Sequence, residues 1–501
     1  MPNSRSDTLE TLCRDEYDLL IIGGGITGAG SALDAAARGM RVALVEKGDF
    51  ASGTSSRSTK LIHGGLRYLK QFEIGLVREV GRERAIIHRL APHLVIPEKM
   101  LLPLIEGGTF GRWATSIGLF TYDLLAGVTG DDRYKMLNKE EALQQEPLLP
   151  ADKLLGAGYY SEYRTDDARL TIEVMKTAAR HGAQVINYVQ AEDLLYKDGR
   201  VAGAHCRDVL TDTTYTIRAK MVVNATGPWS DELRRADGSL GDKHIFQTKG
   251  VHIVVHRHDF PVRQAIYFDV PDGRMVFAIP RLNYVYVGTT DTPYHGDLDH
   301  IPAEPQDIQY LLDAVNQMFP DILLPKEKVL ATWAGVRPLI YEAGKSASEI
   351  SRKDEIFESE SGLLTIAGGK LTGYRAMAEK IIDRVAKRLR RHFNLHFGDC
   401  RTKEIPLTPR PFRSVGDVQA FQARITGFLQ DQKHVSQPEL VAAYLVQNYG
   451  RQTEDILQKW ATRDGKDLET AEHDFCAENE WVIRREDFDR RTGRALFPPP
   501  G

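Results

Sequence analysis

Residues 54–69 concentrate side chains that could bind an anion and support chemistry beside it. The segment, TSSRSTKLIHGGLRYL, holds three basic side chains, a histidine, six hydroxyl groups and two glycines. Glycines allow a ligand to approach the backbone closely, hydroxyl and N–H groups bind a diphosphate, and cations attract an anionic substrate. Composition alone leaves a second interpretation open, a solvated basic loop without a ligand.

A dinucleotide-binding fingerprint precedes this segment. Gly23-x-Gly25-x-x-Gly28 follows the apolar run 18–22 and opens a helix that should stop at Gly39. The first glycine permits a tight turn, the second admits a diphosphate, and the third lets the helix pack closely on the strand. The helix N-terminus then attracts the phosphates. Glu46 ends the next predicted strand, 41–46, where a carboxylate accepts hydrogen bonds from an unphosphorylated ribose, which disfavours NADP.

Two later segments favour FAD over NAD as the bound dinucleotide. One predicted strand ends in Ala225-Thr226-Gly227. Another, 362–367, leads through Gly368-Gly369 into a long helix from about residue 372 to 391. Flavoproteins commonly return a last strand and helix to the flavin ring, where the positive end of the helix stabilises the charge of reduced flavin. We therefore expect FAD as the cofactor.

Six motifs in order give the chain a family resemblance. GGGITGAG, TSSRSTKLIHGGLRYL, VNATGPW, GTTD, GVRPL and GGKLTGYR strongly resemble the FAD-dependent glycerol-3-phosphate dehydrogenase family, over about residues 17–392. The resemblance continues more weakly to RRT at 490–492. It implies the amino-acid-oxidase type of FAD fold. It also implies oxidation of sn-glycerol 3-phosphate to dihydroxyacetone phosphate, with electrons passed to membrane quinone.

Under this resemblance, a dianionic substrate needs fixed cations. Arg337 is the first candidate, because its guanidinium matches a phosphate or a developing alkoxide in bidentate fashion. A structural salt bridge is the alternative for Arg337. Arg67 and Lys370 are the next substrate candidates, and Tyr68 is a candidate wall or hydrogen-bond donor. Lys370 follows Gly369 and could contact either flavin or phosphate.

The hydroxyl proton of such a substrate must also leave, and histidine has a suitable pKa for a base near pH 7. His252 in KGVHIVV and His63 in LIHGG are the candidates, each weighed against a buried structural histidine. A cation such as Arg337 could instead stabilise the alkoxide without a dedicated base. Thr289 and Thr290, in GTTD, are expected to orient the substrate.

The expected FAD contacts come from the glycine fingerprint, Glu46, the basic segment 54–69 and the two later segments that follow predicted strands. They are Gly23, Gly24, Gly25, Ile26, Thr27, Gly28, Glu46, Thr54, Ser55, Ser56, Lys60, Leu61, His63, Gly64, Gly65, Ala225, Thr226, Gly227, Gly368, Gly369, Lys370, Leu371 and Thr372. Asp166-Asp167-x-Arg169 also resembles a family motif, but we expect structural ion pairs there.

The elements that position these residues define an α/β fold. A Rossmann-type FAD-binding domain over 17–400 is interleaved with an antiparallel-sheet substrate (cap) domain, mainly about 75–150 and 240–345. Residues 71–150 are expected to be mostly helical, whereas 183–224 are expected to be rich in strands. Apolar and polar residues alternate over 245–300, which predicts an antiparallel sheet with one covered face. A proline-bearing linker then leads to a C-terminal helical domain, 401–501.

Composition limits the partners and the compartment. The net charge is −4, so nothing indicates a nucleic-acid partner. Four scattered cysteines form no CxxC pair, which favours reduced thiols in a cytoplasmic protein without a metal site. No apolar run is long enough to span a bilayer. We expect peripheral contact with the anionic inner face of the cell membrane, through 112–127 or the basic helix end 384–391, against a buried helix and ordinary helix capping.

Four functions therefore stay open at this stage. The first is a glycerol-3-phosphate:quinone oxidoreductase, and the second is an oxidase that passes electrons to oxygen. The third, an amine or amino-acid oxidase, fits poorly with the extra cations Arg67 and Lys370. The fourth is a non-catalytic flavin-binding regulator or adaptor. A homodimer is a candidate assembly that no motif supports.

Overall fold

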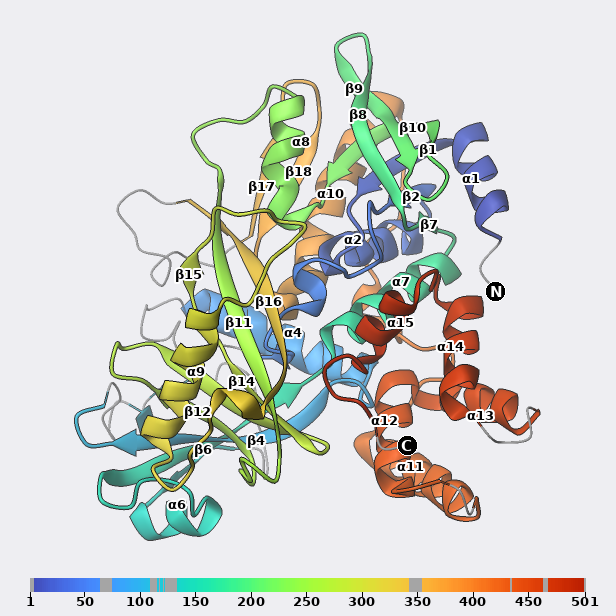
Figure 1. Cartoon of the computed structure of the whole chain (residues 1–501). Helices are drawn as coiled ribbons and strands as arrows, with labels where there is room; N and C mark the ends of the chain where they lie inside the picture. Colours follow the sequence, from blue (N-terminus) through green and yellow to red (C-terminus); the bar gives the residue numbers. More distant parts are fainter. Residues whose placement is uncertain are drawn as a thin grey trace.

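The computed structural model combines two β-sheets, helices packed between and around them, and a helical C-terminal region (Figure 1). It describes residues 4–63, 74–108, 115–116, 118–119, 121, 133–341, 354–432, 435–462 and 467–499. This arrangement is the α/β fold with an additional sheet that the sequence predicts; among the described strands that sheet is antiparallel but for one parallel pair.

The first sheet is the predicted nucleotide-binding sheet. Its order is β17-β18-β10-β1-β2-β7, parallel from β18 to β7, with β17 antiparallel at the edge. The bounds are β1 Glu16–Ile22, β2 Val42–Val45, β7 Gln184–Ile186, β10 Thr213–Asn224, β17 Asp354–Glu358 and β18 Leu364–Gly368. The hairpin β8 (Val189–Lys197) and β9 (Arg200–Asp208) extends from β10. The strands predicted at 18–22, 41–46 and 362–367 are therefore confirmed.

Helices cover one face of this sheet, and a helix and a hairpin cover part of the other. Helix α2 (Ile26–Ala37) lies between α7 (Asp167–Arg180) and α10 (Tyr374–Phe393). Leu19 and Ile21 of β1 pack into the core beneath these helices. The alternate residues Leu20 and Ile22 pack into a second core with α1 (Arg5–Arg14) and the β8–β9 hairpin. Both faces of β1 are thus buried, as a wholly apolar parallel strand requires.

The second sheet contains the strands predicted over 245–300. Its order is β15-β11-β14-β13-β12-β4-β6-β3, with β16 on β11 and β5 on β6. The bounds are β3 Leu61–Ile62, β4 Ile96–Ile105, β5 Lys135–Leu137, β6 Leu154–Arg164, β11 Ile245–His256, β12 Ala265–Asp269, β13 Met275–Arg281, β14 Tyr284–Gly288, β15 Thr292–Pro293 and β16 Val329–Ile340.

Two expectations about this sheet are wrong. Its central strands are covered on both faces rather than one: Val251 and Ile253 of β11 pack under α9 (Pro305–Met318), while Val254 packs into a separate apolar cluster. The described part of 71–150 also contains a long strand, where helices and loops were expected. Helix α4 (Ile74–Leu90) is present, but β4 is a ten-residue strand buried between β6 and β12. Pro97 and Pro103 hide its strand pattern, because proline is rare inside strands.

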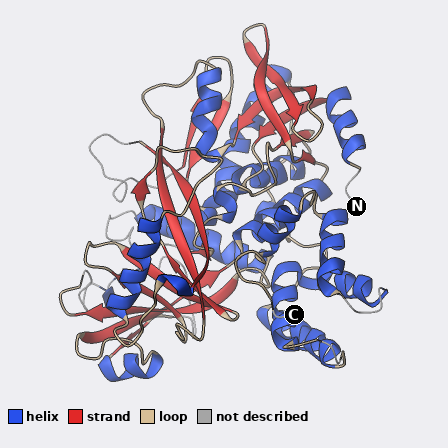
Figure 2. Ribbon diagram, viewed as in Figure 1, coloured by secondary structure: helices blue, strands red, loops and turns tan. Residues whose placement is uncertain are grey.

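The C-terminal region is helical, as predicted, and the residues described there include no strand (Figure 2). It comprises α11 Val415–Gln430, α12 Pro438–Tyr449, α13 Thr453–Thr462, α14 Leu468–Asn479 and α15 Arg485–Thr492. Leu445, Trp460 and Phe475 belong to its own apolar core. Helix α15 packs against α7 of the nucleotide-binding part (Figure 1). The domain boundaries proposed from the sequence stay predictions.

Candidate active site

The glycine fingerprint forms the turn between β1 and α2. Gly23 has a φ of +114°, and a β-carbon there would lie 2.5 Å from the carbonyl oxygen of Ala225 at the end of β10. A β-carbon on Gly28 would lie 1.9 Å from the carbonyl oxygen of Gly23. These two positions exclude any larger residue, so α2 starts close to the sheet. The N–H of Ile26, its first residue, donates to Ser55 Oγ at 2.9 Å.

A cavity of about 710 Å³ opens at this turn, large enough for a cofactor. Gly25, at the N-cap of α2, lines it together with most of the residues predicted to contact FAD. The predicted residues that line it are Gly23, Gly25, Ile26, Thr27, Glu46, Thr54, Ser55, Ala225, Thr226, Gly227, Gly368, Gly369, Lys370 and Leu371. A site with phosphate-binding amides, an acid and a second strand-to-helix junction therefore fits FAD.

Glu46 is fixed at the edge of this cavity. Its carboxylate accepts hydrogen bonds from the backbone N–H groups of Gly24, at 2.7 Å, and Gly48, at 2.9 Å. Burial raises the pKa of Glu46 although these two N–H groups oppose the shift. Each carboxylate oxygen keeps a further lone pair for a ribose hydroxyl.

Glu46→Gln should weaken FAD binding about ten- to hundred-fold, because hydrogen bonds to a charged acceptor contribute roughly 1.5–3 kcal/mol. The amide also offers only one oxygen to Gly24 and Gly48. Quenching of flavin fluorescence during titration of flavin-free protein measures the dissociation constant. An unchanged constant would show that Glu46 serves only to shape the turn.

A second, smaller cavity of about 160 Å³ adjoins the first. The two share lining residues from α2, the 54–57 segment and the Gly369–Leu371 junction. All three predicted catalytic residues, Arg337, His252 and His63, line the smaller cavity, and Lys370 lines both. The structure thus brings together the cation and histidine candidates next to the junction where a flavin ring is expected.

Arg337 projects from β16 and is held by the loop after β14. Its Nη2 donates to Thr289 Oγ1 at 3.0 Å, and its Nη1 donates to the Thr290 carbonyl oxygen and to Asp291 Oδ1, both at 3.3 Å. A β-carbon on Gly250 would lie 2.4 Å from the guanidinium, so only glycine leaves room for it. Within the described residues, these contacts hold the guanidinium of Arg337 in the wall of the smaller cavity, beside the carboxylate of Asp291.

His252 is both a buried core residue and part of the cavity wall. Its ring stacks on Trp333 with centroids 4.4 Å apart, and its Nε2 lies 3.0 Å from Thr59 Oγ1. Burial, together with the charges of Arg337 and Lys60, lowers the pKa of His252 well below 6.5. The imidazole is therefore neutral at pH 7.

Some predicted residues lie elsewhere. Lys60 lines neither cavity: it is buried, and its Nζ is 2.5 Å from Asp167 Oδ1, so its role is a structural ion pair. Thr290 is also buried, where its Oγ1 accepts from the backbone N–H of Val251 and its carbonyl oxygen accepts from Arg337; its expected contact with the substrate stays a prediction. Thr289 likewise acts on Arg337.

The remaining predicted residues divide into three groups. Gly24, Gly28 and Ser56 shape the turn and loop without lining a cavity, while Leu61, His63 and Thr372 line only the smaller cavity. Gly64, Gly65, Arg67 and Tyr68 lie outside the described residues. The expected ion pairs of the Asp166 motif are present: Asp167 pairs with Lys60, Asp166 with Arg281, and Arg169 with Glu480.

Sequence reasoning also missed residues that the fold brings to the site. Arg57 lines both cavities, and within the described residues its guanidinium forms no ion pair or hydrogen bond. Burial lowers the pKa of Arg57. In the sequence, the position of Arg57 inside the basic segment 54–69 was the signal for a place in the site. Trp333, which lies opposite His252 on β16 and stacks on it, lines neither cavity and carries no such signal in the sequence.

Similarity to known proteins agrees with this geometry. A family model described as FAD dependent oxidoreductase matches residues 18–375. Aerobic glycerol-3-phosphate dehydrogenase of Bacillus subtilis (strain 168) is 50% identical, over 98% of this chain and 90% of that protein. The solved structure of glycerol-3-phosphate dehydrogenase from Bacillus halodurans complexed with FAD has a TM-score of 0.81 and 41% identity, over 98% of this chain and 88% of that one.

A more distant structure supports the fold alone. L-alpha-glycerophosphate oxidase from Mycoplasma pneumoniae with FAD bound has a TM-score of 0.61 at 19% identity, over 79% of this chain and 100% of that one.

Proposed function

This chain belongs to the FAD dependent oxidoreductases, and within them to the aerobic glycerol-3-phosphate dehydrogenases, and on that premise we propose how it oxidises its substrate. The reaction converts sn-glycerol 3-phosphate to dihydroxyacetone phosphate. Bound FAD supplies the acceptor for the hydride from the secondary alcohol carbon. The observation that carries the proposal is the convergence of Arg337, His252 and Lys370 on one cavity beside the FAD-binding turn.

The cations of the smaller cavity bind and orient the substrate. Arg337 presents its guanidinium fork to the phosphate or to the oxygen that becomes the ketone, and Lys370 adds a second positive charge at the junction of the two cavities. Together with Arg57, which also lines this cavity, these cations suit the two negative charges of a phosphate, whereas a simple carboxylate substrate carries only one. This charge balance favours a phosphorylated alcohol over an amino acid.

His252 accepts the hydroxyl proton in this proposal. Because its pKa lies well below 6.5, the ring is unprotonated at pH 7, and a proton can be taken up as the substrate phosphate brings negative charge close to it. His63 lines the same cavity and is the alternative base.

His252→Asn should lower kcat about 100-fold, at the lower end of what a positioned base contributes, while the flavin absorbance spectrum stays that of the wild type. His63→Asn is the matched variant in the same cavity. Steady-state rates with saturating glycerol 3-phosphate compare the two. A larger loss in His63→Asn than in His252→Asn would reassign the base to His63.

Anaerobic mixing of the FAD-loaded protein with glycerol 3-phosphate tests the reaction itself. Loss of flavin absorbance near 450 nm is expected within the mixing time of a stopped-flow experiment. Unchanged absorbance with FAD bound would contradict the proposal and favour a flavin-binding regulator or adaptor. An oxygen electrode then separates the two acceptors, since an oxidase consumes oxygen at the rate of substrate turnover.

We further propose that membrane quinone accepts the electrons and that the protein docks peripherally on an anionic inner membrane surface. No helix within the described residues is long and apolar enough to cross a bilayer. Arg384, Lys387, Arg390 and Arg391 are exposed near the end of α10, whereas Arg388 pairs with Glu358. Each exposed cation near anionic lipid contributes about 1 kcal/mol.

Vesicle sedimentation tests the docking. Binding to vesicles with anionic lipid should exceed binding to neutral vesicles and should fall when salt is added. Equal binding to both would contradict the role of the basic helix end. The segment 112–127 lies largely outside the described residues, and the homodimer stays a prediction.

A further inference from the structure

The C-terminal helical region reaches the cofactor cavity at one point. Arg484, which precedes α15, lines the larger cavity together with Tyr188. Its guanidinium lies 4.8 Å from the centre of the Tyr188 ring. The hydroxyl of Tyr188 in turn donates to Oδ1 of Asp487, a residue of α15, at 2.7 Å. Arg484, the N-cap of α15, and Asp487, within α15, therefore hold Tyr188 in the wall of the cavity. Most other residues of that wall lie more than 250 positions earlier in the sequence.

This contact lies at the end of the cavity where the adenosine part of FAD belongs. The backbone N–H of Tyr188 donates to Gly48, and that of Val189 donates to Glu46, the predicted ribose ligand. Gly369, Lys370 and Leu371 line the cavity where it adjoins the substrate cavity. Arg484 therefore stands beside the ribose-binding acid and away from the substrate cavity, which it does not line.

A second set of contacts connects the C-terminal region to the loop 46–51. Asp49 accepts from Arg491 Nε at 2.8 Å and forms further short contacts with both Arg490 and Arg491. Asn187 bridges the two parts, donating to Asp49 Oδ1 and to the Trp481 carbonyl oxygen. Although burial opposes it, Arg491 and Arg490 lower the pKa of Asp49, which keeps the carboxylate charged.

The same loop carries the contact to the glycine turn. Phe50 packs edge-on against Trp481, with ring centroids 5.5 Å apart. On its other side, Phe50 is so close to Gly24 that a β-carbon there would lie 2.6 Å from the ring. Gly24 donates its N–H to Glu46. A continuous packed path thus runs from the C-terminal region through Phe50 to the acid and the glycine turn.

We propose that residues 481–491 form part of the FAD site. Arg484 contacts the adenosine part of the cofactor, where a planar guanidinium can stack on the base or donate to the ribose. Asp49, Arg490 and Arg491 couple this contact to the position of the loop 46–51. Because coupling between two equilibria is reciprocal, bound FAD must tighten the docking of the C-terminal helices to the same extent as their docking tightens FAD.

Arg484→Gln tests the contact, and Arg485→Gln is its matched control. Arg485 is adjacent, but its side chain is 53% exposed and pairs with Glu469 and Asp489. In titrations of flavin-free protein, Arg484→Gln should raise the FAD dissociation constant about ten-fold, the equivalent of one lost charged contact. It should raise the constant for ADP by the same factor and leave that for FMN, which lacks adenosine, unchanged. Arg485→Gln should change none of them.

A change below two-fold for FAD in Arg484→Gln, or an equal loss for FMN, would overturn the proposed contact. The melting temperature of the flavin-free variant should equal that of the wild type, so that a folding defect is recognised separately. The proposal depends on FAD as cofactor but not on the substrate. Failure here would therefore leave wild-type bleaching by glycerol 3-phosphate untouched.

Hydrogen exchange tests the reciprocal effect. Saturating FAD should slow amide exchange in peptides covering 480–492 of the wild type, and it should slow it less in Arg484→Gln. Exchange that is identical with and without FAD in the wild type would overturn the coupling, even if Arg484 contacts the cofactor.

Discussion

Replacing Arg337 by alanine should lower kcat/KM for glycerol 3-phosphate about 10³-fold, because a positioned cation that stabilises developing negative charge contributes roughly 2.7–4 kcal/mol. The variant should keep its FAD, since Arg337 lines the smaller cavity and not the larger one. Initial rates over a range of substrate concentrations, with the flavin content of each preparation measured by absorbance, give the comparison.

Arg337→Lys is the informative control. Lysine keeps the positive charge but loses the fork that donates to Thr289 and the Thr290 carbonyl group. Partial recovery, to within about 10–100-fold of the wild type, is expected if charge and geometry both contribute. Activity of Arg337→Ala within a few-fold of the wild type would mean that the guanidinium serves only its pairing with Asp291.

The parts of the site that the sequence predicts well are local ones. Gly23, Gly28 and Glu46 act through a turn and two neighbouring strands, and their spacing alone encodes that geometry. Helix α2 could be predicted for the same reason, as could the strand and helix around Gly369. In each case the residues that must lie together are close in the sequence.

The structure departs from the expected contacts where a partner distant in the sequence binds the side chain. Lys60 sits in a basic segment typical of anion binding, yet Asp167, more than 100 residues later, binds its ammonium group. Thr290 occupies a motif at a strand end, but the backbone of Val251 uses its hydroxyl. Nothing near Arg484 in the sequence indicates a cofactor cavity, because its place there depends on the docking of α15 against α7.

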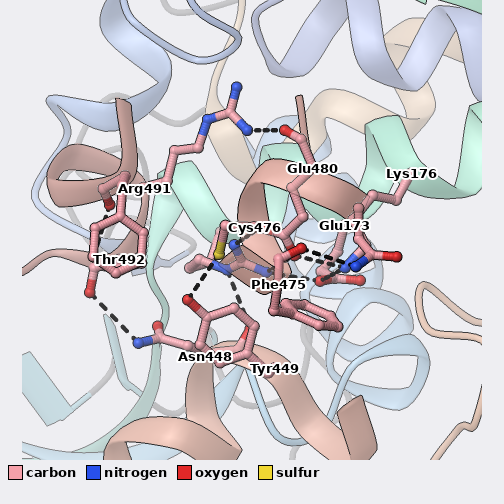
Figure 3. Close-up of polar contacts among 12 residues, drawn as sticks. Glu173, Lys176, Asn448, Tyr449, Phe475, Cys476, Glu480, Arg491 and Thr492 are labelled. Atoms are coloured by element: carbon pink, nitrogen blue, oxygen red, sulfur yellow. Dashed lines mark hydrogen bonds and ion pairs between the residues drawn. The ribbon is translucent and has the colours of Figure 1, made fainter. Parts of the chain in front are cut away.

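A buried ionic cluster, shown in Figure 3, connects α7 to the C-terminal helices. Outside the apolar cores, we expect Glu480→Ala to be the most destabilising single replacement. Arg169 donates to both carboxylate oxygens of Glu480, at 2.5 and 2.9 Å. Lys176 donates to the same carboxylate at 2.8 Å, and the side chain of Glu480 is fully buried. Removing it leaves two buried cations facing the single carboxylate of Glu173. Breaking such a pair costs about 3–5 kcal/mol.

Denaturant unfolding of the FAD-loaded protein measures this loss, with Glu478→Ala as the matched control in α14, the helix that Glu480 caps. The carboxylate of Glu478 is 53% exposed and pairs only with Lys459 among the described residues, so its removal should cost less than about 1 kcal/mol. A Glu480→Ala variant that unfolds within 1 kcal/mol of the wild type would show that the cluster relaxes or admits water once the carboxylate is removed.

The pH dependence gives an independent check on the same carboxylate. Burial opposes ionisation, but Arg169 and Lys176 hold the pKa of Glu480 well below its ordinary value of 4.5. A carboxyl with a depressed folded-state pKa stabilises the fold fully above its unfolded pKa and loses that contribution as the pH falls below it. Wild-type stability should therefore decline on acidification below about pH 4.5, while Glu480→Ala, already lacking this carboxylate, should decline less steeply over the same range. If both proteins lost stability in parallel, other acids would have to account for the acid sensitivity, and the ion pair would contribute chiefly to orienting α7 against the C-terminal helices.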